Sequence, residues 1–524
     1  MKRRWWTLLL VILLLAAGGV TVWWIQKGPR TTGDLAQAQS LYTENCAVCH
    51  GPSGDGKGEA AYLLQPKPRN FRAGQFRLVT SQNLAPTRDD VYRTVSNGMP
   101  GTAMPSWMQL AEPDRWALAD YVLKLYRDGW YEKGLGLGYP PAEAEKYAAE
   151  MTAPGAPVSI PPEPPLTPAG LKQGAELYRA ACANCHGENG EGRRDPTWRT
   201  AEGFPTWSRN LRQGVFKSGR SGEQLYLMFS TGLPGTPMPQ QTFTPEQTWR
   251  VVQYVLSLSS PAAQEAAQVR QAEINARRVA KLPGGAEDAA WERVPEVRIP
   301  LMPLWWNEQS IGTVRVRAAH DGERLAFLLE WEDATRDAEA IRQKSFPDGA
   351  AVQFSAQTNP PLFAMGAPGQ QVNIWHWKAL WSEDRRQFQD VASVFPNLAV
   401  NAYFGSQKGW KSEPLEDKQF RPAQAAQNLI AHAERPSIVE DANATGLGTL
   451  TSQPAEQQSV EGVSVWKNGV WRLQLTRLFQ SGDGGDVRLG PGQRVSAAFA
   501  IWNGSAGDRN GQKNVSIWNA LRLE

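Results

Sequence analysis

The segment C-x-x-C-H occurs twice in this chain and constrains its fold more than any other feature. The pattern is the attachment signature for c-type haem. Two thiols add to the two vinyl groups of one porphyrin, while the adjacent histidine reaches the iron from the same turn. The two copies use all four cysteines of the 524-residue chain, so none is left for a disulfide. The cysteines predicted to attach the two haems are Cys46, Cys49, Cys182 and Cys185. The histidines predicted to bind the iron are His50 in the first copy and His186 in the second.

The surroundings of the motif also repeat, which predicts two copies of one domain. Each motif follows a short amphipathic helix that contains Leu-Tyr, and each is followed by an Arg-Asn-apolar-Arg-x-Gly-x-Phe segment. A Gly-x-Pro-Gly-Thr-x-Met-Pro loop comes next, at 98–105 and 232–239, and a helix containing Tyr-Val-Leu closes each copy. We therefore predict domains at 31–138 and 167–261. The Pro- and Ala-rich segment 139–166 between them is expected to be a stiff linker.

The methionine of each repeated loop is the predicted second axial ligand of its haem. A soft thioether favours reduced iron and raises the potential into the range of an electron carrier. Met104 and Met238 lie at nearly the same distance in sequence from their histidines. Met99 and Met108 are rivals for the first haem, but Met99 aligns with Leu233 and Met108 lies beyond the repeated proline. Packing in the haem pocket is the alternative role for these methionines.

The two repeats resemble class I cytochrome c, a small helical fold around one haem, over roughly 32–127 and 167–259. The resemblance implies two all-α domains that each carry one covalent haem c. It also implies that both irons are six-coordinate, with no open position for a substrate. Electron transfer, rather than catalysis in this chain, is the function that follows from the resemblance.

The first residues of the chain have the pattern of a membrane anchor. A basic cluster at 2–4 precedes an uncharged run, of which 5–25 is apolar enough to cross the ~30 Å core of a bilayer. Tryptophan pairs at both ends of the run are typical of membrane interfaces, and the basic cluster favours a cytoplasmic N-terminus. We predict a single-pass transmembrane helix within 1–30, which would place the haem domains on the periplasmic side of the cell membrane. A cleaved signal peptide is the alternative.

The C-terminal half has a different pattern. Residues 262–285 are rich in Ala, Glu, Gln and Arg and are expected to form a helical connector. From 286 to 524, apolar and polar residues alternate between turns rich in Gly, Asn and Asp, which is the period of β-strands. Hairpin signals lie at Asp321-Gly322 and Asn468-Gly469, and a further strand is expected at 494–502. These features predict a mainly-β sandwich.

Two blocks of this β region resemble the haem-b-binding subunit of ethylbenzene dehydrogenase. The first begins with Met365-Gly366 and continues with Val-Asn-Ile-Trp-His-Trp-Lys-Ala, and the second contains Arg-Asn-Gly-Gln-Lys-Asn-Val-Ser-Ile-Trp. In that family a Met and a Lys hold one noncovalent haem b, and the matching residues here are Met365 and Lys513. Burial would favour the neutral amine that lysine needs to bind iron. His376 is the competing ligand, although strand alternation would turn it away from the pocket. His320 and His432 are expected at the surface.

The same domain occurs in subunits of nitrate reductases, nitrite oxidoreductases, and dimethylsulfide, selenate and chlorate enzymes. The resemblance therefore implies that the β domain docks on an iron-sulfur subunit, which is connected to a molybdenum subunit where the substrate reacts. The two c haems would exchange electrons with a respiratory carrier or membrane complex. Nitrate or nitrite is the expected substrate. The net charge of only +3 argues against a nucleic-acid partner.

Three other functions stay open on the sequence alone. A dihaem peroxidase would need one haem without a loop methionine. A dihaem cytochrome c subunit of a terminal oxidase or dehydrogenase would carry a β domain that binds protein or sugar instead of haem b. An adhesive β-sandwich with vestigial haems conflicts with the two intact C-x-x-C-H motifs.

Overall fold

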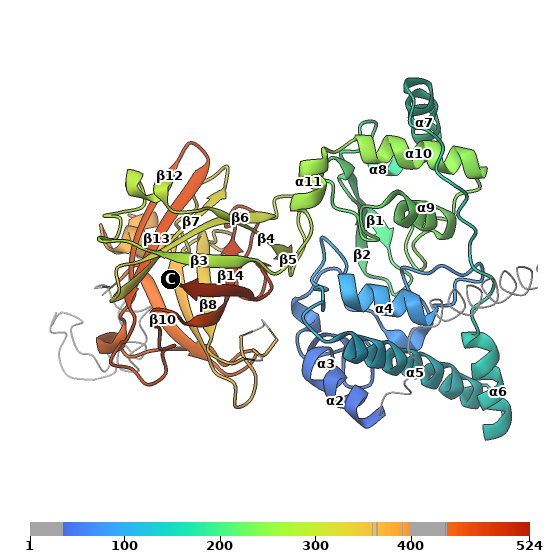
Figure 1. Ribbon diagram of the computed structural model, residues 1–524, viewed down its shortest axis with the longest axis horizontal. Helices are drawn as coiled ribbons and strands as arrows, with labels where there is room; N and C mark the ends of the chain where they lie inside the picture. Colours follow the sequence, from blue (N-terminus) through green and yellow to red (C-terminus); the bar gives the residue numbers. More distant parts are fainter. Residues whose placement is uncertain (1–34, 359, 363–364, 390, 398–434, 436) are drawn as a thin grey trace, which may run out of the picture.

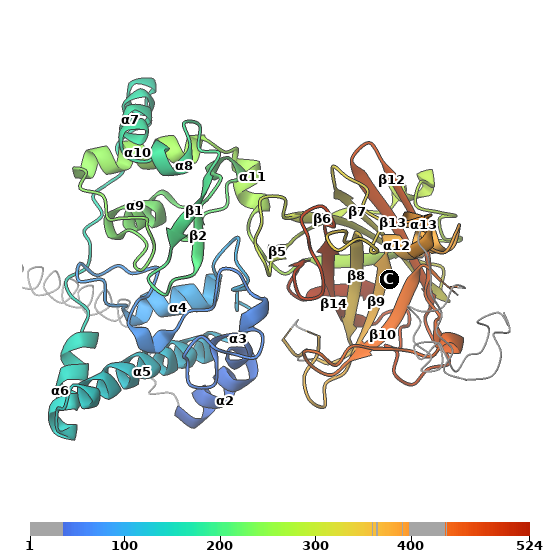
Figure 2. The ribbon, with the colours of Figure 1, turned by 180° about the vertical axis from the view of Figure 1, so that it is seen from behind.

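The computed structural model describes residues 35–358, 360–362, 365–389, 391–397, 435 and 437–524. Two helical domains lie one above the other at one end of the molecule, and a β domain lies at the other end (Figures 1 and 2). The transmembrane helix predicted within 1–30 falls outside the described residues and is not supported. Among the described helices, none is both long and apolar enough to cross a membrane. The longest, α5 (Glu112–Gly136), carries Asp, Glu, Lys and Arg along its length.

The first helical domain is built around α5. Its other helices are α2 (Leu35–Asn45), α3 (Ala47–His50), α4 (Arg88–Asn97) and α6 (Pro141–Thr152), with 3-10 turns η1 (Ala61–Leu63) and η2 (Phe71–Ala73). A capping box between Thr87 and Asp90 starts α4. The apolar face of α5 packs against α2 and α4, with Leu118 and Tyr121 in the core.

Part of the predicted stiff linker is a helix. Within 139–166, α6 packs back onto α5, and its Ala144 and Ala148 are fully buried there. Proline at its first position is compatible with a helix, because that N–H has no intrahelical partner. Proline content at the two ends of the segment therefore concealed an amphipathic helix between them.

The second helical domain repeats this plan with one addition. Its helices are α7 (Pro168–Ala181), α8 (Ala183–His186), α9 (Gly222–Thr231), α10 (Pro245–Ser257) and α11 (Pro261–Ala266), with the 3-10 turn η3 (Leu211–Gln213). The addition is an antiparallel strand pair, β1 (Arg193–Arg199) and β2 (Pro205–Ser208), so the prediction of an all-α domain is wrong here. Gly203, with a φ of 84°, allows the chain to reverse between the two strands.

The predicted helical connector at 262–285 is also wrong beyond its first turn. Helix α11 ends at Ala266, and β3 (Glu273–Arg278) follows. Ile274 and Ala276 of β3 are buried in alternation with exposed residues. Strand β3 pairs in parallel with β16 and β6, so its backbone hydrogen bonds are made with distant segments. Tertiary pairing thus overrides the helical preference of an Ala-, Glu- and Arg-rich stretch.

The β domain is one sheet path that folds over to form two facing layers. Its strands follow the order β11-β10-β9-β8-β14-β16-β3-β6-β7-β13-β12, and β15, β4 and β5 pair at its side. The remaining bounds are β4 (Val297–Pro300), β5 (Met302–Pro303), β6 (Thr313–His320), β7 (Arg324–Glu332), β8 (Gly349–Ser355), β9 (Val372–Lys378), β10 (Val439–Ala444), β11 (Thr451–Ser452), β12 (Glu461–Lys467), β13 (Val470–Leu478), β14 (Arg494–Trp502), β15 (Asn514–Val515) and β16 (Asn519–Leu523). Short helices α12 (Ala379–Asp384) and α13 (Val391–Val394) and the 3-10 turns η4 (Ala289–Arg293) and η7 (Ala455–Gln457) complete it.

The two predicted hairpins and the strand at 494–502 are confirmed. Strands β6 and β7 pair antiparallel, as do β12 and β13. Asn468 and Gly469 join β12 to β13 with φ values of 53° and 75°, as a type I′ turn requires. His320, expected at the surface, is instead fully buried, and its Nε2 donates to the Glu524 carbonyl at 2.7 Å. His432 lies outside the described residues.

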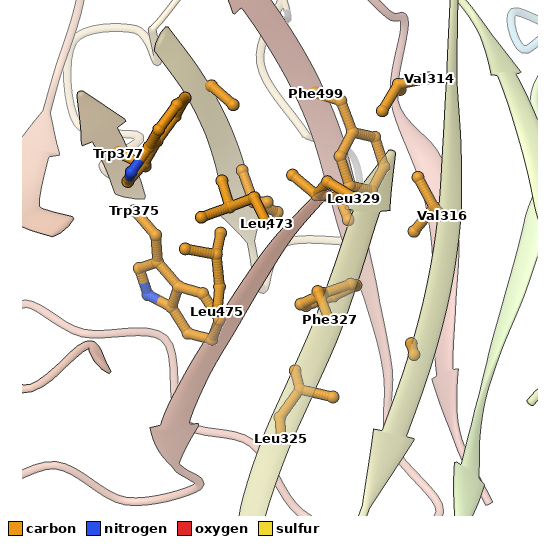
Figure 3. Close-up of a cluster of buried hydrophobic side chains, with 14 of the residues drawn as sticks. Val314, Val316, Leu325, Phe327, Leu329, Trp375, Trp377, Leu473, Leu475 and Phe499 are labelled. Atoms are coloured by element: carbon orange, nitrogen blue, oxygen red, sulfur yellow. The ribbon is translucent and has the colours of Figure 1, made fainter. Parts of the chain in front are cut away.

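The aromatic core of the β domain lies between the two layers (Figure 3). Phe327 of β7 packs against Phe354, Trp375 and Phe499 of the opposite layer, with ring centroids 6.0–6.2 Å apart. Edge-to-face contacts of this kind add to the stabilisation from burying apolar area. Phe327, Phe354 and Trp375 are all fully buried.

A buried polar cluster adjoins this core. Arg477 pairs with Asp486 at 3.1 Å and lies over the ring of Trp375. Asn373 donates to Asp441 at 2.8 Å. Burial, together with the charge of Asp486, raises the pKa of Asp441 from 3.8 to about 7. Folded protein therefore retains a proton on Asp441 that the unfolded chain releases.

Asp441→Asn is expected to stabilise the β domain in a pH-dependent way. Because the folded pKa lies above the unfolded value, the contribution of Asp441 to stability falls by about 1.4 kcal/mol per pH unit between pH ~4 and ~7. The variant lacks this loss of stability, so its advantage over wild type grows from pH ~4 to pH ~7 and stays constant above that. Thermal unfolding followed by near-UV circular dichroism measures the difference, with exposed Glu461→Gln as the control. An advantage that stays constant from pH ~4 to pH ~7 contradicts the assignment.

Candidate haem sites

The first C-x-x-C-H motif forms a tight turn after α2. The His50 amide donates to the Cys46 carbonyl at 2.9 Å, which makes the two thiols and the imidazole part of one turn. His50 Nδ1 donates to the Arg69 carbonyl at 3.0 Å, and Phe71 stacks on its ring. Burial lowers the pKa of His50 to about 4, so the imidazole is neutral and its Nε2 is available as a ligand. Burial raises the pKa of the Cys46 and Cys49 thiols to about 12 and about 11.

The second motif has the same local geometry. The His186 amide donates to the Cys182 carbonyl at 2.9 Å, and His186 Nδ1 donates to the Arg209 carbonyl at 3.2 Å. Tyr178 Oη donates to the Gly187 carbonyl at 2.8 Å, as Tyr42 Oη does to Gly51 in the first domain. The repeated Leu-Tyr pair thus places a tyrosine under each motif.

The two methionine loops contain the same backbone hydrogen bond. The Met99 amide donates to the Met104 carbonyl at 3.0 Å, and the Leu233 amide donates to that of Met238 at 3.1 Å. Met104 lines the same cavity as Cys46, Cys49 and His50, and so does Met99. Met108 does not: its side chain is 58% exposed and its sulfur accepts from Arg115. Met99 therefore remains a rival of Met104, whereas Met108 does not.

Met365 and Lys513 of the β domain line one cavity together. Met365 precedes Gly366 with a φ of 71°, a left-handed conformation that a methionine rarely adopts and that is typical of functional sites. Lys513 Nζ lies 4.6 Å from the centre of the Trp502 ring. Burial lowers the pKa of Lys513 to about 8, and no ion-pair partner for it exists among the described residues. A soft thioether and a readily neutralised amine on an apolar cavity fit an iron porphyrin.

His376 also lines this cavity, so the expectation that β9 would turn it away is wrong. Its ring stacks on Trp502 with centroids 4.8 Å apart, and its Nδ1 lies 3.6 Å from a Glu440 carboxylate oxygen. The same oxygen accepts from Lys378 at 2.5 Å. Stacking and the carboxylate contact hold the imidazole in the cavity wall.

One cavity lies between the first helical domain and the β domain, and residues of the second helical domain, among them Trp207, Arg209 and Thr236, also line it. It measures about 1430 Å³, above the ~300–1,000 Å³ of a typical single-ligand pocket. His50 and Met104 of the first helical domain line it, and so do Met365 and Lys513 of the β domain. Of the described residues around it, none is a cysteine, histidine or loop methionine of the second motif.

Sequence reasoning missed the residues that hold the two domains together at this cavity. The Gln65 amide donates to the Leu304 carbonyl, and the Trp306 amide donates to the Gln65 carbonyl, both at 2.9 Å. Leu63 packs closely on Gly511, where a Cβ atom would lie 2.7 Å from Leu63 Cδ1 and the leucine side chain would have to shift. Leu63 ends the short turn η1 and Gln65 follows it, in a segment without periodicity, so nothing in the sequence signals these contacts.

Family comparisons agree with this division of the chain. The family described as Ethylbenzene dehydrogenase matches residues 288–514. The family described as Cytochrome c matches 171–259, and that described as Cytochrome C oxidase, cbb3-type, subunit III matches 33–122. These families support haem as the cofactor of the sites.

Three curated proteins are similar to large parts of the chain. "Putative respiratory nitrate reductase heme subunit ORF7" of Haloferax mediterranei is 27% identical over 44% of this chain and 64% of its own length. Dimethylsulfide dehydrogenase subunit gamma of Rhodovulum sulfidophilum is 32% identical over 46% and 76%. Chlorate reductase subunit gamma of Ideonella dechloratans is 26% identical over 38% and 84%. The chain thus spans less than two thirds of the Haloferax protein. This chain belongs to the family of haem-carrying, electron-transfer gamma subunits that includes dimethylsulfide dehydrogenase subunit gamma.

Proposed function

We propose that this chain carries three haems in series. One haem c is held by Cys46, Cys49, His50 and Met104, and a second by Cys182, Cys185, His186 and Met238. One noncovalent haem b is held by Met365 and Lys513. The single observation that carries this proposal is the cavity shared by the first haem c motif and the Met365–Lys513 pair.

The position of the cavity supports an order of electron transfer. Since His50 and Met104 line it together with Lys513, haem c of the first domain is the neighbour of haem b. The cysteines, histidine and loop methionine of the second motif do not line this cavity, so the second haem c would stand at the far end of the series. Electrons then pass between haem b, the first haem c and the second haem c.

The partners follow from the family. The β domain would dock on the iron-sulfur subunit of a molybdenum oxidoreductase, and the second haem c would exchange electrons with a respiratory carrier or complex outside the cytoplasm. The name of the Haloferax relative supports nitrate as the substrate, with nitrite as its counterpart in the reverse reaction. This chain would transfer the electrons of that reaction and would not bind its substrate.

The test is nitrate-driven oxidation of the purified, pre-reduced complex, followed in the haem absorption bands. Wild type should lose the reduced bands of haem b and of both c haems. Lys513→Ala, which lacks haem b on this account, should leave both c haems reduced at the rate seen without nitrate. Lys467→Ala removes an equal charge from a side chain that is 70% exposed, and it should behave as wild type.

Two results would contradict the proposal at different points. Rapid oxidation of the c haems in Lys513→Ala would show that electrons do not pass through haem b. Failure of nitrate to oxidise any haem of the wild-type complex would exclude nitrate as the substrate and leave the order of the haems to be tested with nitrite or chlorate.

A further inference from the structure

The two methionine loops lie at the contact between the helical domains, and each is held by an arginine of the other domain. Arg209, from the second domain, donates through Nη1 to the Pro100 carbonyl at 2.7 Å and through Nη2 to the Gly101 carbonyl at 3.1 Å. Both carbonyls belong to the loop that carries Met104. The guanidinium group therefore clamps that loop at two points.

An arginine of the first domain contacts the equivalent part of the methionine loop of the second domain. Arg77, from the first domain, donates to the Pro234 carbonyl of the loop that carries Met238. Pro234 occupies the same place in its loop as Pro100 does in the first. The contact between the domains is thus reciprocal, although Arg77 holds one carbonyl and Arg209 holds two.

Glycines in both loops make these contacts possible. Gly101 and Gly235 have φ values of 68° and 73°, a region that glycine adopts without strain. A Cβ atom at Gly101 would collide with the guanidinium group of Arg209, and one at Gly235 would collide with the side chains of Gln75 and Arg77. The repeated Pro-Gly of the two loops therefore serves the contact between the domains as well as the turn.

Arg209 also touches the haem site of its own domain, through its backbone. Its carbonyl accepts the Nδ1 proton of His186, while its side chain binds the loop of Met104. One residue thus connects the histidine side of the second site with the methionine side of the first. Burial lowers the pKa of Arg209 to about 10, which still leaves the guanidinium charged at neutral pH.

We propose that Arg209 and Arg77 are positioning residues that act across the domain contact, so that each tunes the haem of the opposite domain. The clamp fixes the loop carbonyls, and it would thereby hold the methionine sulfur in place as a ligand of the iron. A loosened thioether favours reduced iron less, so the potential of that haem falls. This inference rests on the proposed ligands Met104 and Met238.

The test is a spectroelectrochemical titration of the full chain. In a Met238→His background the first haem c is the one with a methionine ligand, so its potential can be read separately. Adding Arg209→Met there should lower the potential of the first haem c and weaken its methionine-to-iron charge-transfer band. Adding Arg209→Met to a Met104→His background should shift the second haem c less. Arg77→Met should give the mirror image, with the larger shift in the second haem c.

Two further variants separate the clamp from charge and from folding. Arg209→Lys keeps the charge but not the two-point clamp, and it should shift the first haem c in the same direction by a smaller amount. Arg179→Met removes a charge from an exposed side chain of α7 and should leave both potentials unchanged. If Arg209→Met does not fold, Arg209→Lys and Arg77→Met decide the question.

The outcomes distinguish this inference from the ligand assignment beneath it. If Arg209→Met and Arg209→Lys shift the second haem c as much as the first, or shift neither, the action across the contact is refuted. If Met104→His alone moves no potential, the ligand assignment is wrong and the inference falls with it.

Discussion

Lys513→Ala should abolish the haem that acid acetone extracts from this protein, while both covalent haems stay attached. Lys513 lines the cavity next to Trp502 and has no ion-pair partner among the described residues, so its amine is free to bind iron. Alanine offers no ligand atom. Changes to residues that merely support a metal ligand cost ~10–100-fold in affinity, so loss of the ligand itself should cost more than about 100-fold. Haem content of the purified chain, before and after extraction, measures the effect.

Two variants sharpen this experiment. Lys467→Ala, on an exposed side chain, should retain the full complement of haem b. His376→Ala tests the rival ligand that also lines the cavity, and it should retain haem b with an unchanged spectrum. Normal haem b in Lys513→Ala, together with loss of haem b or a changed haem b spectrum in His376→Ala, would assign the ligand to His376 instead.

Met104→His should lower the potential of one haem c and leave the amount of covalent haem unchanged. Imidazole stabilises oxidised iron more than a thioether does, and axial ligands set haem potentials over a range of ~0.8 V. We expect a fall on the order of 100 mV. Since each ~59 mV changes the ratio of reduced to oxidised haem tenfold for one electron, this ratio at a fixed potential falls by well over tenfold. A redox titration of the c-haem absorption band measures the shift, and Met238→His should do the same to the other haem.

The remaining methionines of the first domain provide the controls. Met108→His changes an exposed side chain outside the cavity and should shift neither potential. Met99→His tests the rival that does line the cavity. A shift of the haem potential with Met99→His but none with Met104→His would make Met99, and not Met104, the axial ligand.

The parts of the structure that the sequence predicts are those set by local rules. The Asn468-Gly469 turn requires positive φ values that few residues adopt, so the hairpin of β12 and β13 could be located from two residues. The haem motifs and the methionine loops could be paired because they occur twice with nearly the same spacing. The two copies within the chain could thus be compared with each other, as related sequences would be.

The predictions from sequence are wrong or missing where residues distant in sequence determine the local structure. Strand β3 exists because β16 and β6 accept its backbone hydrogen bonds, and neither lies near it in sequence. His320 is buried where its Nε2 bonds to the backbone oxygen of Glu524 and its ring contacts Phe479, and both residues are distant from it in sequence. The joint cavity depends on Gln65 and Trp306, which carry no periodic signal. The mutual arrangement of the three domains could therefore not be predicted.

The most direct test of the three-haem account is a pyridine haemochrome spectrum of the purified chain, recorded before and after acid-acetone extraction. The account predicts two c haems that resist extraction and one b haem that is removed, per chain. Two c haems with no extractable haem would contradict it, because the cavity lined by Met365 and Lys513 would then have another purpose.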